Sequence, residues 1–152
     1  MWGFQRPDAA GWERLLSGVS AVGAGTVLGV ARWLTPDAAG FGTHRQLGLG
    51  ACTFLVLTGL PCPMCGATTT FALMADLRPL DAVLNQPFAA ALAVATGFVF
   101  AVSAAEVVLP RRRWTRIAIA IGDREIQVAA AFLVLMGLAW VWKVYTVGAP
   151  AP

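Results

Sequence analysis

The chain has 152 residues, of which 58% are hydrophobic and 12% are charged. Roughly a quarter of the residues in soluble domains are charged, so this composition excludes an ordinary soluble domain and indicates one integral membrane domain, residues 1–152. The net charge of +3 comes from arginines beside apolar runs, which is a signal of membrane topology, and we expect no nucleic-acid binding.

The first predicted membrane span covers about residues 15–34. Residues 15–31 carry no charge, and Arg32 and Trp33 follow them as residues that favour the membrane surface. Residues 1–14 mix both charges with tryptophan and lack the basic start of a signal peptide. We therefore expect an uncleaved span.

Small residues recur every four positions in this span, at Ala21, Gly25 and Gly29. This spacing places them on one helix face, where small side chains allow another helix to pack closely. The stripe predicts contact with other membrane protein subunits. The competing interpretation is that glycine and alanine are simply abundant here.

The central segment, residues 46–76, is uncharged until its last residue. As one helix it would be about 45 Å long, which exceeds the roughly 30 Å of bilayer hydrocarbon. Pro61 and Pro63 each remove a backbone donor and disfavour helix at the preceding residue. We predict helical arms over about 46–57 and 65–75, separated by a Cys-Pro-Met-Cys-Gly elbow, and a re-entrant path. Irregular backbone at bilayer depth needs cover, so the elbow is a candidate site.

Two further uncharged runs predict membrane spans at about 87–109 and 126–145. Pro79 is expected to begin a short interfacial helix that ends near Leu84, and Pro87 to begin the second span. The last span ends in residues typical of an aromatic and basic anchor at the membrane surface, namely Trp140, Trp142, Lys143 and Tyr145. The predicted fold is therefore all-α, with three transmembrane helices and one proline-broken segment.

The arginine-rich loop from Arg111 to Arg116 sets the expected topology. Positive residues mark the cytoplasmic side, and charge counts place this loop there for either a re-entrant or a crossing central segment. The half-length arms favour the re-entrant path, with the N-terminus inside and the elbow facing outward. Residues 117–126 are consistent with either a hairpin turning at Gly122 or an interfacial helix.

The elbow cysteines have the spacing of a zinc knuckle. Cys62 and Cys65 can both face one metal ion, the proline fixes the turn, and a glycine follows. A closed zinc site has four ligands, and Cys52 and His44 are the candidates for the remainder. Because Cys52 and Cys62 would be about 15 Å apart in a continuous helix, this site requires a bend, which we expect at Gly59.

Three other interpretations of the elbow remain. A helix that starts at Cys65 would lower the pKa of both thiols of the Cys-x-x-Cys pair, as in a thiol–disulfide oxidoreductase. The same helix start, with its threonines Thr68, Thr69 and Thr70, could receive an anion. Alternatively, the cysteines only pack as small apolar residues.

The chain resembles a family of small bacterial membrane proteins, the domain-of-unknown-function family number 2752. The resemblance rests on His44, Leu47-Gly48, Cys52-Thr53-Phe54, Leu57-Thr58-Gly59, Cys62-Pro63-Met64-Cys65-Gly66, Thr68, Asp76-Leu77 and Asn85-Gln86-Pro87. This chain has Thr53 where the family usually has proline and Thr69 where many members have arginine. All three cysteines fall on motif positions, which implies more than packing.

These observations together favour a binding or accessory protein over an enzyme. We expect a multi-pass protein of the bacterial cytoplasmic membrane whose cysteine site holds a metal ion, zinc before others. The alternatives are a membrane thiol–disulfide oxidoreductase using Cys62 and Cys65, and a structural accessory subunit. The lipid bilayer is the expected partner in each case.

Overall fold

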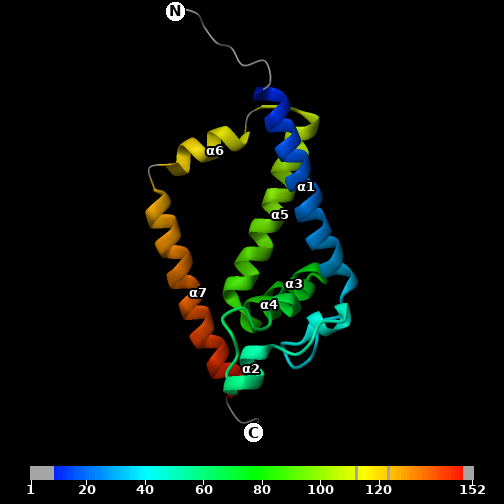
Figure 1. Ribbon diagram of the computed structural model, residues 1–152, viewed down its shortest axis with the longest axis vertical. Helices are drawn as coiled ribbons and strands as arrows, with labels where there is room; N and C mark the ends of the chain where they lie inside the picture. The colour runs from blue at the N-terminus through cyan, green and yellow to red at the C-terminus, as the bar shows by residue number, and fades with distance from the viewer. Residues whose placement is uncertain (1–8, 112, 123, 149–152) are drawn as a thin grey trace, which may run out of the picture.

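The computed structural model describes residues 9–111, 113–122 and 124–148, and every regular element among them is a helix (Figure 1). In chain order these are α1 (Ala9–Trp33), the 3-10 helix η1 (Thr43–Leu47), α2 (Thr53–Thr58), α3 (Ala67–Ala75), α4 (Pro79–Asn85), α5 (Pro87–Val108), α6 (Arg113–Gly122) and α7 (Glu125–Gly148). The all-α prediction is confirmed for the described residues.

Three of the helices are long and apolar enough to cross a membrane. These stretches are Gly11–Trp33, Pro87–Val108 and Glu125–Val147, close to the three predicted spans. Large apolar side chains such as Val22 of α1 and Leu133 of α7 are exposed on the outside of the molecule. An apolar exterior on helices of this length suits contact with a lipid bilayer.

Prolines begin two helices where the sequence predicted them. Pro79 lies in the first turn of α4 and Pro87 in the first turn of α5, where a missing backbone donor is harmless. Gln86 caps α5, because its side-chain oxygen accepts a hydrogen bond of 2.7 Å from the backbone N–H of Ala89. These positions fix where the chain turns from the short helices into the second long one.

Helices α1 and α5 pack along each other, and α7 runs beside them on the other side of α5 (Figure 1). The packing of α1 on α5 uses part of the small-residue stripe, since a Cβ placed at Gly25 would lie 3.0 Å from a ring carbon of Phe100. A Cβ at Gly29 would meet nothing within 4 Å. Use of the stripe by another subunit therefore stays a prediction.

The segment between α1 and α5 lies at one end of the long helices, and α6 lies at the other (Figure 1). At the α6 end, Thr115 donates a hydrogen bond to Glu13 of α1. At the other end, Arg32 of α1 pairs with Asp76 over 3.2 Å. The broken segment thus starts and finishes at the same end of the molecule, while its re-entry into the bilayer stays a prediction.

The predicted helical arm over 46–57 is mostly wrong. Gly48 adopts a left-handed conformation with φ +77° and ends η1, so the chain is irregular until α2 begins at Thr53. The bend expected at Gly59 is confirmed, because this residue ends α2 with φ +70°. The second arm begins at Ala67, two residues later than predicted, since Gly66 is left-handed at φ +89°.

Two interpretations were left open for residues 117–126, and the structure has the helical one. Residues 113–122 form α6, so a β-hairpin across this stretch is excluded. Arg113 and Arg116 lie near its start, while Ile119 and Ile121 further along are exposed. A short helix that combines arginine with exposed isoleucine has the character expected at a membrane surface.

Candidate thiol site

The elbow is a pair of tight turns that leads into α3. The backbone N–H of Cys65 donates to the carbonyl of Cys62 over 2.9 Å, and that of Ala67 donates to Met64 over 3.0 Å. Gly66 then provides the left-handed conformation from which α3 starts. The two elbow cysteines are therefore held in a turn rather than in the first turn of a helix.

All three cysteines are free thiols, and the fold brings them together. Cys52 precedes α2 and is half-buried, Cys62 is half-buried, and Cys65 is buried with 6% of its surface exposed. The thiol of Cys52 interacts with that of Cys62, and both act electrostatically on Cys65. The reversal at Gly59 makes this possible, because it returns the chain towards the start of α2.

Local environment divides the three thiols by their acidity. The backbone N–H of Leu55 lowers the pKa of Cys52, with help from the neighbouring thiol of Cys62. Burial raises the pKa of Cys62 and of Cys65. The expectation that a helix start would lower the pKa of both elbow thiols is wrong, because α3 starts at Ala67 and desolvation outweighs the nearby backbone donors.

His44 takes another direction. Its Nε2 atom lies 3.0 Å from the carbonyl oxygen of Gly50, with which it forms a hydrogen bond within the loop after η1. Across the described ranges, no group of three or more histidine, cysteine and acidic side chains is arranged to hold a metal ion. The arrangement therefore adds no support to the four-ligand zinc site of Cys52, Cys62, Cys65 and His44, which stays a prediction.

A buried lysine lies beneath the elbow. Lys143 of α7 is 2% exposed, and its Nζ atom donates to the carbonyl of Gly40 over 3.0 Å. It also donates to Asn85, over 2.8 Å to the side-chain oxygen and 3.3 Å to the carbonyl. The prediction that Lys143 anchors the span at the membrane surface is therefore wrong, because three oxygen atoms inside the protein take up its N–H groups.

Asn85 and Gly66 complete this polar network. The Asn85 amide donates to the hydroxyl of Thr70 over 2.9 Å and to the carbonyl of Gly66 over 3.3 Å. A Cβ placed at Gly66 would lie 2.5 Å from the carbonyl oxygen of Gly40 and 3.1 Å from Lys143 Nζ. Only a glycine lets the elbow sit this close to the lysine.

The carbonyls of both elbow prolines are also held from outside the segment. Trp140 of α7 donates its indole N–H to Pro61 over 2.8 Å. The fully buried amide of Gln86 donates to Pro63 over 2.9 Å. The turn that carries Cys62 is thus fixed from both sides, by α7 and by the residue that caps α5.

Sequence reasoning found the three cysteines but missed the residues that support them. Asn85 and Gln86 were noted only as part of a family motif, and Lys143 was assigned to the membrane surface. The available signal was the pair of amides directly before Pro87, since a polar pair between apolar helices needs hydrogen-bond partners. Nothing in the sequence near Lys143 distinguishes an inward from an outward lysine.

The comparisons with known proteins add one match. Residues 52–100 match the family described as Protein of unknown function (DUF2752). This match confirms the family resemblance over that part of the chain, which contains the three cysteines, Asn85 and Gln86 but neither His44 nor Lys143. No curated protein and no solved structure matches the chain.

Proposed function

We propose that this chain, whose residues 52–100 belong to the DUF2752 family of proteins of unknown function, is a membrane protein that exchanges thiols with disulfides through Cys52 and Cys62. The observation that carries the proposal is the contact between these two thiols, which approach from either side of the Gly59 bend. Two free thiols in contact are the reduced form of a reversible disulfide.

Cys52 has the properties of the attacking group. It is half-buried rather than buried, and its thiol ionises more readily than an ordinary one because of the Leu55 backbone N–H. The thiolate is the nucleophilic form of cysteine. Cys62 is then the second thiol of the pair, while Cys65 is buried behind it.

The proposed reaction oxidises the protein and reduces a disulfide of a substrate. The Cys52 thiolate attacks one sulfur of that disulfide, forms a mixed disulfide and displaces the other sulfur as a thiolate, which takes the proton of Cys62. The Cys62 thiolate then attacks the sulfur of Cys52 and releases the second substrate sulfur as a thiol once it is protonated. Two protein thiols become one disulfide, and one substrate disulfide becomes two thiols.

The position of the site in the molecule supports this chemistry. The thiols lie at the end opposite α6 (Figure 1), whose arginines Arg113 and Arg116 mark the cytoplasmic side if the positive-inside rule holds. The thiols would then face the outer side of a bacterial cytoplasmic membrane, where disulfides persist.

Zinc binding is the second candidate. It is favoured by the convergence of three cysteines and by the knuckle turn from Cys62 to Cys65, whose backbone hydrogen bond measures 2.9 Å. The thiols would have to move to share one ion, because their present arrangement is not one that holds a metal. This candidate gives the site a structural role rather than an exchange reaction.

Differential alkylation and mass spectrometry of the purified protein test the proposal. After treatment with a small disulfide such as oxidised glutathione, we expect a reversible Cys52–Cys62 disulfide in the natural chain and in Cys65→Ser. Cys52→Ser and Cys62→Ser should not form it. In the reduced protein, Cys52 should be alkylated faster than Cys65, because it is more acidic and more accessible.

Metal analysis of the same samples separates the two candidates. One equivalent of zinc in the natural chain that is lost in Cys62→Ser, together with thiols that resist oxidation, would establish the zinc site and refute the exchange reaction. A disulfide confined to Cys62 and Cys65 would also contradict the proposed pairing. Thermal unfolding of each variant serves as the control for folding.

A further inference from the structure

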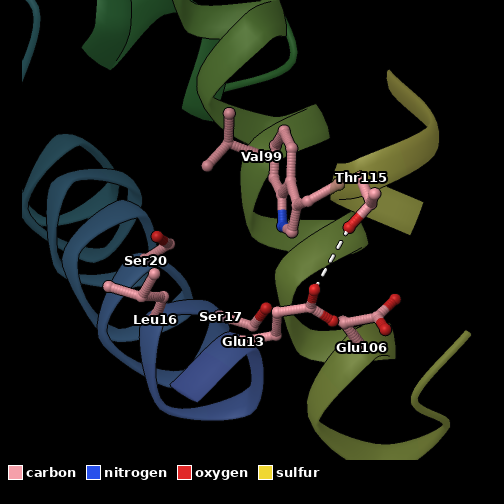
Figure 2. Close-up of a pocket in the computed structure, with 8 residues that line it drawn as sticks. Glu13, Leu16, Ser17, Ser20, Val99, Glu106 and Thr115 are labelled. Carbon is pink, nitrogen blue, oxygen red and sulfur yellow. Dashed lines mark hydrogen bonds between the residues drawn. The ribbon is translucent and has the colours of Figure 1, made fainter. Parts of the chain in front are cut away.

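A separate cavity lies at the α6 end of the molecule, away from the thiols. It occupies about 250 Å³ between α1, α5 and α6 (Figure 2). Its polar and aromatic lining consists of Glu13, Ser17, Ser20, Glu106, Trp114 and Thr115. The inference drawn from it is independent of the thiol chemistry, since none of these residues touches the elbow network.

The hydroxyl of Ser17 is directed into this cavity without a protein partner. Ser17 is 3% exposed, and no hydrogen bond holds its side chain among the described residues. Other hydroxyls in the long helices bond to their own helix, as Thr26 does to the Val22 carbonyl and Thr96 to Leu92, both over 2.8 Å. Every fully enclosed side-chain nitrogen and oxygen atom of the described residues has a partner. The Ser17 oxygen therefore touches the open space of the cavity.

The charge around this space is negative. The ionisable side chains of described residues that line it are two carboxylates, Glu13 and Glu106. Glu106 accepts hydrogen bonds from the backbone of Arg111 over 2.8 Å and from the Arg113 guanidinium over 3.2 Å. Glu13 accepts one from the Thr115 hydroxyl over 3.3 Å, across the cavity from α1 to α6 (Figure 2). The Glu13 carboxylate therefore lies on the same side as the Ser17 hydroxyl.

An aromatic wall completes the lining. The indole N–H of Trp114 donates to the hydroxyl of Ser103 over 3.2 Å, which fixes the ring at the start of α6. A carboxylate and a hydroxyl accept hydrogen bonds from an ammonium group, and the face of an indole ring attracts a cation. A primary ammonium group has three donors for these acceptors, whereas a quaternary one has none.

We infer that this cavity binds a primary ammonium group, held by Glu13 and Ser17 against the ring of Trp114. The ammonium could belong to an ethanolamine phospholipid or to a free amine. The lipid source fits the place, because the cavity lies at the end of the apolar spans, where headgroups lie, and exposed Arg116 is available on α6 for a phosphate.

Binding of lipids and free amines to the purified full chain tests this inference. Native mass spectrometry measures ethanolamine and choline phospholipids of identical tails, and the tryptophan fluorescence of Trp114 reports free ethanolamine or butylamine, with Trp114→Phe identifying its signal. We expect ethanolamine lipid to bind about tenfold or more tightly than choline lipid. Glu13→Gln and Ser17→Ala should each reduce that preference, the former by about tenfold.

The variants have matched controls. A glutamine at position 13 can still accept the Thr115 hydrogen bond, so Glu13→Gln should keep its fold, which thermal unfolding verifies. Glu125→Gln removes an exposed carboxylate at the start of α7 and should leave binding unchanged.

Each outcome decides the matter. Tight binding of the ethanolamine lipid alone assigns the cavity to headgroups, and binding of the free amines as well assigns it to amines in general. Equal binding of choline and ethanolamine lipids, failure of Glu13→Gln to change the affinity, or no binding of any of the compounds would overturn the inference.

Discussion

Gly66 is the single residue that sets how closely the elbow approaches its support. Its φ of +89° lies in the region that side chains disfavour, and an added Cβ would come within 2.5 Å of the Gly40 carbonyl oxygen. That oxygen is backbone and also accepts from Lys143, so it cannot move aside without breaking a hydrogen bond. Conformational strain and steric overlap therefore act together at this position.

Gly66→Ala is expected to lower the free energy of unfolding by about 2–4 kcal/mol. Chemical or thermal unfolding in detergent measures this change. Gly97→Ala is the matched control, because Gly97 lies inside α5 and a Cβ there would meet nothing within 4 Å. That variant should be neutral or slightly more stable. Equal stability of the two variants would contradict the close approach of the elbow to Gly40.

The acidity of the thiols illustrates what a sequence conceals at this scale. The spacing of Cys62 and Cys65 correctly indicated a tight turn followed by a helix. Their pKa values depend instead on how much of each thiol is buried and on where the helix starts. Burial arises from residues far away in the chain, so motif spacing alone pointed to the wrong pair. The acidic thiol is Cys52, whose only local signal is its place before α2.

Among the elements, α7 has the most uneven attachment. Its first half is exposed, as shown by Ile126 and Val128, while polar contacts concentrate near its C-terminal end. There Lys143 bonds Gly40 and Asn85, and Trp142 donates to the carbonyl of Leu84 over 2.7 Å. In Figure 1 the two ends of α7 differ in the same way, since it meets the other helices at its lower end. The last helix is therefore fastened to the elbow by a small set of hydrogen bonds.

Lys143→Met is expected to cost about 3 kcal/mol of stability, because it leaves the oxygens of Gly40 and Asn85 buried without their donor. Unfolding in detergent measures the loss, and limited proteolysis should show earlier cleavage near the end of α7. Arg32→Met is the control, since Arg32 is exposed and its ion pair with Asp76 should contribute less than about 1 kcal/mol. An unchanged stability of Lys143→Met would show that the lysine is not held inside.

The elements themselves could be predicted only where one strong local signal governs them. Uncharged runs gave the long helices, and prolines gave the starts of α4 and α5. The arm over 46–57 failed because the glycines at 48 and 50 allow irregular backbone that the apolar character of the stretch conceals. Lys143 failed because a lysine among tryptophans has the same sequence pattern whether it reaches outward to the surface or inward to carbonyl groups.

At the scale of the whole molecule, the two candidate sites occupy opposite ends of the spans. The thiols and Lys143 lie at the end where α1 finishes, and the cavity lined by Glu13 lies at the end where α1 begins (Figure 1). If the arginines of α6 are cytoplasmic, the thiols face outward. The two sites would then serve different compartments.

Labelling with a membrane-impermeant maleimide tests this orientation. In a chain whose three cysteines are replaced by serine, Ala38→Cys in the loop after α1 and Ala118→Cys on α6 each provide one exposed thiol. Intact cells should label the first and not the second, and permeabilised cells should label both. The reverse pattern would place the thiol site in the cytoplasm and remove the argument from an oxidising compartment.

The overall architecture followed from the sequence more readily than its internal connections. Three spans and a broken segment at one end were foreseen, because hydropathy and helix-breaking residues are local properties. The family match covers residues 52–100, yet the network beneath the elbow also needs Gly40 and Lys143 from outside it. Contacts between such distant residues depend on how the helices assemble, which no single stretch encodes.

The hydrogen bonds from Lys143 to Gly40 and Asn85 also impose an order on biosynthesis. A ribosome delivers the three cysteines to the membrane long before it delivers position 143, so the nascent protein carries its thiols without the lysine that later underlies them. During translation those sulfur atoms are therefore less sheltered than in the finished molecule, and insertion of the final helix is the event that closes the structure around them.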